Sequence, residues 1–342
     1  MIALVDSCKD TSGHNVIYLK ELHSIENTEV VSLDIDNGEQ NNVFAFLYNR
    51  YKNFKKQLSV ANSARIIHFL HADLYYMVPF LKKFYNKERR VILTMHYFPT
   101  GRIRQKLLKN FCSKANKVIV HSSYIKSQYN NIGIRNVEYI DYPSFYDYSK
   151  IQNSRVLKIQ MGLEEGDIVF SALGGTRFDK GLDILIDAFS MLSPDIKKRV
   201  VLNIAGRPLI FKEDFIKKKA LGANFKMRLV LKELSEDEFL ENVVVSNYIV
   251  LPYRKDFTGN SGPMTEAVVN RIPCIVSDHG NIGYLTKVFK IGRTFRSEEP
   301  NSLADVIKEE VLNSKDYDFS YANNLSKKSF IDKHKYLYNS VV

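Results

Sequence analysis

Two glycine-bearing turns in the second half of the 342-residue sequence have the residue types that bind phosphate groups. The first contains Gly174 and Gly175 after the apolar run 167–173, with Arg177 and Lys180 close behind. Glycines allow a tight turn and a close approach of the backbone to a ligand. Cations beside such a turn can neutralise the charge that develops on a diphosphate leaving group. A plain strand-to-helix loop with two solvated cations fits these residues equally well.

The second turn precedes a predicted helix whose N-terminus is suited to an anion. A buried strand is expected to end near Leu251, and a helix is expected to begin near Gly262. Pro263 suits the first helical position because its missing N–H would be an unpaired donor there. The free N–H groups of Gly262, Met264 and Thr265 are expected to face outward with the positive end of the helix dipole. This helix start is therefore predicted to bind an anion.

Glu266 lies one turn into the same predicted helix. Its carboxylate could accept hydrogen bonds from a ribose diol while the phosphates lie at the start of the helix. Alternatively, Glu266 only complements the helix dipole, a contribution of about 0.3–1 kcal/mol. Because a phosphate site and a sugar site would then be adjacent, we favour the nucleotide interpretation.

The elements expected to position these residues alternate between apolar strands and amphipathic helices. Strands are predicted over residues 2–5, 65–70, 91–95, 117–121, 167–173, 200–205, 243–251 and 273–277, and a helix over 181–192. Such alternation is typical of parallel sheets covered by helices on both faces, which bind ligands beyond the carboxyl ends of their strands. The polar and aromatic stretch 142–155 interrupts the alternation and predicts a connector between two α/β domains, with a cleft between them.

Length and composition fit two globular domains and exclude several classes of protein. A hydrophobic content of 45% argues against disorder. The three cysteines, Cys8, Cys112 and Cys274, are far apart and odd in number, which favours neither a disulfide framework nor a zinc site. The N-terminal apolar run is too short for a signal peptide, and no run of about 18 apolar residues could span a membrane. We therefore expect a cytoplasmic protein.

The net charge of +11 is concentrated in residues 50–126, which contain 17 Lys and Arg against two acidic residues. Residues 101–117 within this stretch predict an amphipathic helix with a basic face. Such a helix is typical of attachment to an anionic membrane surface, which would make the protein peripheral on the inner face of the membrane. A core-packed helix with a solvated basic face is the alternative. No nucleic-acid recognition motif accompanies the basic residues, so nucleic acid is not an expected partner.

The eight histidines lack the spacing of metal ligands, and no D-x-D motif is present. We therefore expect no metal site and metal-independent chemistry, in which protein cations replace a divalent ion. His96 follows a predicted buried strand, where loops often carry function, although by itself it fits a structural role better. His68 and His71 could line the cleft, whereas His121 is expected to pack in the core. No nucleophile signature of the G-x-S-x-G type is present.

Together these segments resemble the family-four retaining glycosyltransferases of the GT-B fold. GGTRFDKG (174–181) is similar to the family's glycine-to-lysine stretch, and Glu266 with the following AVVNRIPCIVSD is similar to the second of its two glutamates and the segment after it. Further similar segments are VILTMHYFP (91–99), VIVHSSYIKSQY (118–129), SGHNVIYLKEL (12–22) and IVLPYR (249–254). The likeness spans most of the chain in the family's order.

The resemblance implies two Rossmann-like domains that face each other across a deep cleft. Residues 1–148 would bind the acceptor and residues 149–324 the donor, with a C-terminal helix of about 325–342 packing back onto the first domain. The implied reaction moves a sugar, with retention, from a nucleotide-diphosphate-sugar donor to a saccharide or lipid-linked acceptor, in surface polysaccharide or glycoconjugate synthesis. The donor is a co-substrate, and no other cofactor is implied.

The resemblance also assigns residues to roles. Lys180 takes the place of the donor-phosphate lysine and His96 that of a histidine that approaches the donor sugar, so these two residues and Arg177 are the expected catalytic residues. The nucleotide base would lie near Leu229–Glu233. The expected donor-binding residues are Gly174, Gly175, Lys180, Thr258, Ser261, Gly262, Pro263, Met264, Thr265 and Glu266, and the expected acceptor-binding residues are Ser12, Gly13 and His14.

Two positions depart from the family pattern. The first glutamate of the family's pair falls on Thr258, and an arginine usually found five residues before the lysine falls on Gly175. Arg177 or Arg254 could supply the missing positive charge. Two alternatives therefore stay open: a non-catalytic nucleotide-sugar-binding or partner subunit of GT-B fold, and a GT-B epimerase, which would interconvert a nucleotide sugar without any acceptor.

Overall fold

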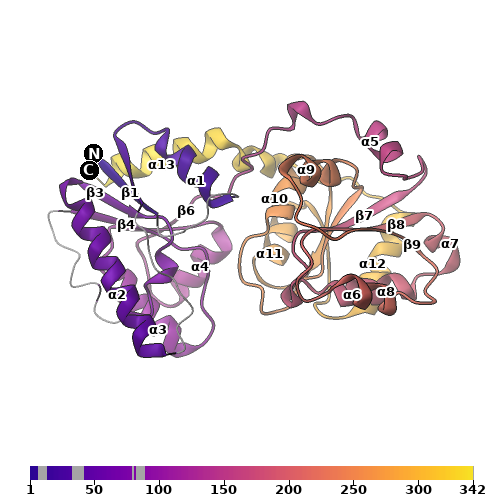
Figure 1. The fold of residues 1–342 in the computed structure, drawn as a ribbon, viewed down its shortest axis with the longest axis horizontal. Helices are drawn as coiled ribbons and strands as arrows, with labels where there is room; N and C mark the ends of the chain where they lie inside the picture. Colours follow the sequence, from indigo (N-terminus) through magenta and orange to yellow (C-terminus); the bar gives the residue numbers. More distant parts are fainter. Residues whose placement is uncertain (7–13, 33–41, 79–80, 82–88, 342) are drawn as a thin grey trace. The chain divides into compact units, whose positions relative to one another are not determined.

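The computed structural model describes residues 1–6, 14–32, 42–78, 81 and 89–341. The chain divides into two compact units, one formed by Met1–Phe145 with Asn324–Val342 and the other by Tyr146–Asn323 (Figure 1). Each unit contains one six-stranded sheet, and every strand pair in both sheets is parallel. Parallel strands need crossover connections, which helices provide in both units.

The first sheet has the strand order β2-β1-β3-β4-β5-β6. Its strands are β1 (Ile2–Asp6), β2 (Thr28–Ser32), β3 (Ile66–Phe69), β4 (Arg90–Thr94), β5 (Lys117–Val120) and β6 (Val137–Tyr139). Its helices are α1 (His14–His23), α2 (Val43–Val60), α3 (Arg102–Cys112), α4 (Ser123–Asn131) and α13 (Lys327–Ser340), with short 3-10 turns at Ala61–Ser63 and Ala72–Leu74.

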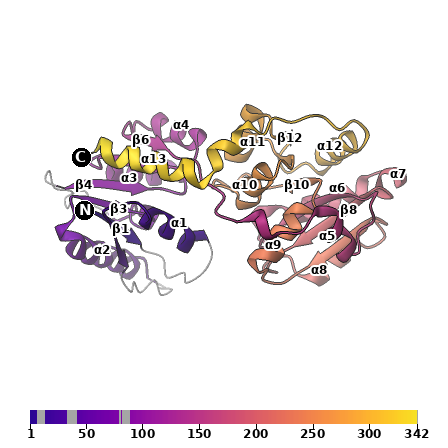
Figure 2. The same ribbon diagram turned by 90° about the horizontal axis from the view of Figure 1, so that it is seen from above.

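Side chains of the four inner strands of the first sheet, β1, β3, β4 and β5, alternate between two hydrophobic clusters on opposite faces. In β4, Val91 and Leu93 pack with α2, α3 and α4 on one face, whereas Ile92 packs with α1 and α13 on the other. Figure 2 shows α13 running along the first unit although it is the last helix in the sequence. Phe330 and Leu337 of α13 are buried in the same cluster as Tyr18 and Leu22 of α1.

The second sheet has the strand order β12-β11-β10-β7-β8-β9. Its strands are β7 (Ile168–Leu173), β8 (Val200–Ala205), β9 (Lys226–Val230), β10 (Tyr248–Leu251), β11 (Cys274–Ser277) and β12 (Gly292–Phe295). Its helices are α5 (Ser154–Gln160), α6 (Leu182–Met191), α7 (Pro194–Lys197), α8 (Glu213–Lys219), α9 (Glu236–Val244), α10 (Gly262–Val269), α11 (Gly280–Phe289) and α12 (Pro300–Leu312), with 3-10 turns at Tyr148–Lys150, Phe178–Lys180 and Ser320–Leu325.

Helices cover both faces of the second sheet as well. Helices α6, α8 and α12 pack together on one face, and α5, α9 and α10 lie on the other (Figure 1). Two doubly wound α/β units of this kind confirm the fold class predicted from the sequence, a GT-B architecture of two Rossmann-like domains.

One predicted strand was wrong in its first half. The segment 243–251 was expected to be a strand throughout, but Val243 and Val244 end helix α9 and β10 begins only at Tyr248. The helix starts at a capping box, in which the Ser235 hydroxyl and the Glu238 carboxylate bond each other's backbone N–H groups. Val243 then belongs to the buried face of that helix, so its apolar character reflects helical packing.

Candidate functional site

Both predicted phosphate-binding turns lie at the switch point of the second sheet. After β7 the chain adds β8 and β9 on one side and then returns to place β10 on the other side of β7. The loops after β7 and β10 therefore leave the same edge of the sheet toward opposite sides, and doubly wound sheets bind ligands at such a point. Residues 174–181 follow β7 and residues 252–261 follow β10.

Glycines allow close backbone contacts around these two loops. Gly206, which follows β8, has a φ of +146°, and a Cβ on it would lie 2.2 Å from the carbonyl oxygen of Gly174. Gly181 has a φ of +62°, and a Cβ there would lie 2.0 Å from the carbonyl oxygen of Pro252. Only glycine avoids both the left-handed strain and the clash at such positions. A small pocket of ≈ 20 Å³ between the loops is lined by Gly174, Gly175, Lys180, Pro252 and Tyr253 among others.

The side chain of Lys180 points at two aromatic rings of the β10 loop. Its Nζ lies 3.7 Å from the centroid of the Tyr253 ring and 4.4 Å from that of Phe257. Burial, and then the positive charge of Arg177, lowers the pKa of Lys180 to about 7, although Asp179 acts in the opposite direction. Ring faces stabilise an ammonium ion without neutralising it. Lys180 is therefore a cation at the edge of the pocket whose pKa lies close to neutral pH.

Tyr253 links Lys180 to the start of α10. Its hydroxyl is 3.1 Å from the Oγ of Ser261, the residue that caps this helix. The structure thus brings together Lys180, Tyr253 and the N-terminus that the sequence predicted to bind an anion. Helix α10 begins at Gly262, as expected.

The predicted set of free amide groups at this helix start needs correction. The Met264 N–H donates to Ser261 Oγ at 3.4 Å, and the Thr265 N–H donates to the carbonyl of Ser261 at 3.1 Å. Pro263 has no N–H. Of the three donors expected to face an anion, two are thus engaged within the helix, because a serine cap satisfies the first turn internally. The long Met264 bond is the weaker of the two.

Two arginines near the first loop are held by carboxylates. Arg177 forms a two-pronged ion pair with Asp179, with Nε–Oδ1 and Nη2–Oδ2 distances of 2.9 and 2.8 Å. Arg254 donates from Nη2 to Asp183 Oδ2 at 2.6 Å, and its guanidinium lies 4.1 Å from the Phe178 ring centroid. The second terminal nitrogen of Arg254, Nη1, is buried without a hydrogen-bond partner among the described residues.

Glu266 is almost fully buried, with 1% of its surface exposed. Its Oε2 accepts a hydrogen bond of 2.9 Å from the hydroxyl of Tyr148, in the connector that opens the second unit. Thr258 lies half-buried in the β10 loop. The stretch Leu229–Glu233, expected near the base, begins at the end of β9 and does not line the pocket between the two loops.

In the first unit, four ionisable side chains gather at the carboxyl ends of the strands. Asp6 ends β1, and His71, His96 and His121 follow β3, β4 and β5. The ring centroids of His71 and His96 are 4.8 Å apart and those of His96 and His121 are 4.9 Å apart, while His71 Nε2 lies 3.7 Å from Asp6 Oδ1. Among the described residues, no group of three or more potential ligands is arranged to hold a metal ion.

His96 is half-buried and has a defined tautomer. Its Nε2 is 2.8 Å from the carbonyl oxygen of Leu70. Since a carbonyl only accepts, Nε2 carries the hydrogen and, in the neutral ring, Nδ1 carries the lone pair. The backbone N–H groups of His96 and Tyr97 donate to the two carboxylate oxygens of Asp73 at 2.8 and 3.1 Å. The His96 loop is therefore firmly held.

His68 and His121 are core residues. His121 is buried and donates from Nδ1 to the carbonyl of Ile140 at 2.9 Å, in agreement with its predicted packing role. His68 lies inside β3, with Nδ1 2.8 Å from the Tyr338 hydroxyl and Nε2 2.7 Å from Thr94 Oγ1. His68 therefore does not line an open surface. Of the predicted acceptor residues, Ser12 and Gly13 lie outside the described residues, and His14 is the first residue of α1.

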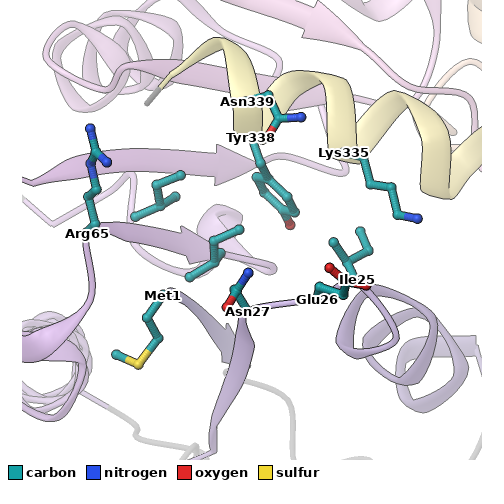
Figure 3. Close-up of a pocket in the computed structure, with 10 residues that line it drawn as sticks. Met1, Ile25, Glu26, Asn27, Arg65, Lys335, Tyr338 and Asn339 are labelled. Carbon is teal, nitrogen blue, oxygen red and sulfur yellow. The ribbon is translucent and has the colours of Figure 1, made fainter.

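A second cavity, of about 520 Å³, lies at the opposite edge of the first sheet (Figure 3). It is lined where β1 and β3 begin, by Met1 and Arg65 among others, and by Lys335, Tyr338 and Asn339 of α13. Since parallel sheets bind ligands at the carboxyl ends of their strands, we place neither donor nor acceptor here.

The basic helix α3 is only partly embedded in the first unit. Leu108 and Phe111 are buried, whereas Ile103, near the start of the helix, is 80% exposed. Phe44 and Tyr48 near the start of α2 are also exposed. Helices α2 and α3 pack on the same face of the sheet, where the rings of Phe54 and Phe111 are 6.4 Å apart. Within the described residues, no helix combines the length and apolar character needed to cross a bilayer.

Comparisons with known proteins agree with this architecture. The model of the family described as glycosyl transferases group 1 matches residues 154–329. Similar solved structures include a sucrose-phosphate synthase from Thermosynechococcus elongatus (TM-score 0.73, 14% identity, 99% of this chain and 98% of that chain covered) and a glycosyltransferase from Rickettsia africae (TM-score 0.71, 15% identity, 99% and 98% covered). Another is HepE from Anabaena in complex with UDP-glucose (TM-score 0.69, 14% identity, 99% of both chains covered). A search of curated protein sequences found no match.

Proposed function

This chain belongs to the glycosyl transferases group 1 family, and we propose that it transfers a sugar from a nucleotide-diphosphate-sugar donor to a saccharide or lipid-linked acceptor. The observation that carries the proposal is the position of Lys180. Its ammonium lies over the rings of Tyr253 and Phe257, at the switch point of the second sheet, and the Tyr253 hydroxyl contacts the Ser261 cap of α10. A half-buried cation at such a point is suited to a diphosphate.

In the proposed complex, the donor diphosphate binds Lys180 and the glycine loop after β7. Gly174 and Gly175 present no side chain at the pocket, so the phosphates can approach the backbone. The Gly262 amide and the dipole of α10 would add to the positive field. The ribose hydroxyls would donate to Glu266. That HepE from Anabaena was solved with UDP-glucose supports a nucleotide sugar as the donor class.

The proposed reaction breaks the bond between the anomeric carbon and the diphosphate oxygen. The electron pair of that bond passes to the leaving diphosphate, where Lys180 stabilises the developing charge in place of a divalent ion. The acceptor hydroxyl forms the new bond on the face that the nucleotide leaves, so the configuration is retained, and its proton passes to the leaving phosphate oxygen. We propose this route because the sequence has no evident covalent nucleophile.

The acceptor is proposed to bind at the carboxyl edge of the first sheet. His96 is the candidate contact because its Nε2–H is fixed on the Leu70 carbonyl, which leaves Nδ1 as the lone-pair nitrogen. A neutral imidazole of this tautomer can accept a hydrogen bond from a sugar hydroxyl. Acceptors of this kind occur in surface polysaccharide or glycoconjugate synthesis, the role that we propose.

The protein is further proposed to work at the inner membrane surface. The α3 face combines exposed Ile103 with Arg102, Arg104, Lys106 and Lys109, and exposed Phe44 lies on the neighbouring helix α2. Apolar side chains beside cations are the composition that binds anionic bilayers. A membrane site would bring the enzyme to a lipid-linked acceptor.

A second candidate is a nucleotide-sugar-binding protein without transferase activity. Thr258 supplies no carboxylate, and Arg177, one of the two candidates to replace the family's arginine, is paired with Asp179. An epimerase is distinguished from both because it would change the sugar without an acceptor.

The proposed function is tested by a thermal-shift screen of UDP, GDP, dTDP and CMP, followed by their sugars and a donor-turnover assay. Specific binding at a hundredfold excess over Kd should stabilise the native state by about 2.7 kcal/mol. Lys180→Ala should remove most of this stabilisation, whereas Lys198→Ala, at the exposed residue that follows α7, should retain it. Binding that is the same in both variants would contradict the proposal, and binding without turnover across donors and acceptors would favour the second candidate.

A further inference from the structure

Two tyrosines of the connector converge on Glu266. The Tyr148 hydroxyl donates to Glu266 Oε2 at 2.9 Å. Tyr146, two residues earlier, packs its ring 5.8 Å from that of Phe239 in α9. The negative charge of Glu266 also acts on both phenols, since it adds to burial in raising the pKa of each. Both phenols therefore stay protonated at neutral pH, and Tyr148 is a permanent donor to the carboxylate.

The contact with Tyr148 lies where the proposed function needs a ribose. The carboxylate of Glu266 is almost inaccessible, since only 1% of the residue is exposed. A ribose hydroxyl, like a phenol, can donate one hydrogen bond to a carboxylate. The two compete for the same lone pair of Oε2, so a nucleoside that uses this lone pair binds only after the phenol has moved.

The segment that carries Tyr148 is a short turn. In this three-residue 3-10 turn, Tyr148–Lys150, the Ile151 N–H donates to the Tyr148 carbonyl and the Ser149 N–H donates to Asp147 Oδ1. Short turns open with lower free energy than the helices of a core. By contrast, Glu266 is fixed in α10, with the carbonyl of its own backbone bonded by Asn270.

We propose that Tyr148 holds the place of a ribose hydroxyl at Glu266, so that donor binding exchanges one hydrogen bond for the other and releases the connector from α10. This inference rests on the proposed function. The exchange makes Tyr148 a competitor of the nucleoside. Removing only the Tyr148 hydroxyl takes one hydrogen-bond donor away from the buried carboxylate in the ligand-free protein. In the complex, a ribose hydroxyl supplies that hydrogen bond again.

The test compares nucleoside diphosphates with and without the competing hydroxyls. The probes are UDP and GDP, each as the ribonucleotide and as the 2′,3′-dideoxynucleotide, with Kd measured by calorimetry. Tyr148→Phe should bind the ribonucleotide roughly 5- to 10-fold more tightly than the wild type, with no such gain for the dideoxynucleotide. Its midpoint of thermal unfolding without ligand should be lower than that of the wild type. Tyr336→Phe, at a largely exposed ring of α13, is the matched control.

Weaker ribonucleotide binding by Tyr148→Phe would overturn the inference, because Tyr148 would then support the nucleoside site instead of competing with it. An equal gain for ribo- and dideoxynucleotides would overturn it as well. If Lys180→Ala still weakens the binding of both ribo- and dideoxynucleotides in these cases, the proposed function holds and only the inference about Tyr148 fails. If no form binds the wild type in a Lys180-dependent way, the proposed function and this inference both fail.

Discussion

Gly181 and Pro252 approach so closely that a single methyl group does not fit between them: a Cβ on Gly181 would lie 2.0 Å from the carbonyl oxygen of Pro252. Gly181 caps α6 and follows Lys180, while Pro252 precedes Tyr253. This contact therefore sets the spacing between the lysine and the ring that its ammonium faces. The backbone itself, and not only the side chains, positions the candidate phosphate site.

Gly181→Ala is expected to lower the free energy of unfolding by about 3 kcal/mol or more, because the new Cβ combines left-handed strain with a backbone clash. Gly162→Ala is the matched control. Gly162 also has a positive φ, +71°, but a Cβ there meets nothing within 4 Å, so only the strain of about 1–2 kcal/mol remains. Urea denaturation of both variants measures the difference. Equal losses would show that the two loops can separate without cost.

Donor binding is expected to weaken above pH 7. Burial, followed by the charge of Arg177, lowers the pKa of Lys180 to about 7. A bound diphosphate favours the ammonium and raises this pKa, so binding takes up a proton above pH 7. The Kd should then rise by up to about tenfold per pH unit until the pKa in the complex is reached, and stay nearly constant below pH 7.

Calorimetry with UDP at several pH values, in buffers of different ionisation enthalpy, measures this proton uptake. Lys180→Arg should remove the uptake, because a guanidinium keeps its charge throughout this range. If wild type and Lys180→Arg show the same pH dependence, the titrating group is not Lys180.

The first unit is expected to lose stability as the pH falls below about 6.5. Burial lowers the pKa of His334 to about 4, and burial together with the charge of His96 lowers that of His71 to about 3. The unfolded chain binds protons near pH 6.5 and the folded chain does not, so stability is fully present above pH 6.5. It declines below that value by about 1.4 kcal/mol per pH unit for each histidine, until the folded pKa is reached.

His334→Gln should reduce the slope of unfolding free energy against pH between pH 6 and 4.5 by about 1.4 kcal/mol per pH unit. Urea denaturation at several pH values measures this slope. His23→Gln, at an exposed residue of α1, is the matched control. If the slope is the same in His334→Gln and in the wild type, the His334 ring of the wild type is protonated in the folded state.

Replacing Arg102, Arg104, Lys106 and Lys109 with Gln is expected to abolish pelleting with anionic vesicles. Each cation near such a surface contributes about 1 kcal/mol, so the loss of four lowers affinity by roughly three orders of magnitude. The matched control replaces Lys198, Lys212, Lys217 and Lys218 of the second unit, four exposed lysines, and changes the net charge equally. If both variants pellet to the same extent, membrane binding depends on net charge or does not involve α3.

The sequence predicted the central strands of both sheets and missed the edges. The four unpredicted strands, β2, β6, β9 and β12, are the outermost strands of the two sheets. Edge strands have one open side and one partner, so they tolerate polar residues such as Lys226 and Arg228 in β9. The inner strands are buried on both faces of the sheet, so their sequences are continuous apolar runs, and these runs made them predictable.

The candidate site was predictable in its backbone but not in its side-chain partners. Glycine spacing and Pro263 were enough to place the two loops and the start of α10. The rings around Lys180, by contrast, come from a loop more than 70 residues away, and nothing in the local sequence links them. Likewise, the stretch 142–155 was recognisable as a connector from its polar and aromatic composition, while the contact of Tyr148 with Glu266 spans 118 residues.

Helix α13 has a consequence for how the protein is made. Phe330, Leu337 and Tyr338 complete the cluster that buries Tyr18 and Leu22 of the first unit, yet all strands of the second unit are synthesised before them. During synthesis, every strand of the second unit is therefore made before the first unit can complete its hydrophobic core. An isolated fragment ending at Phe145 would leave that interior open to water, so a separately expressed first unit needs α13 fused behind it.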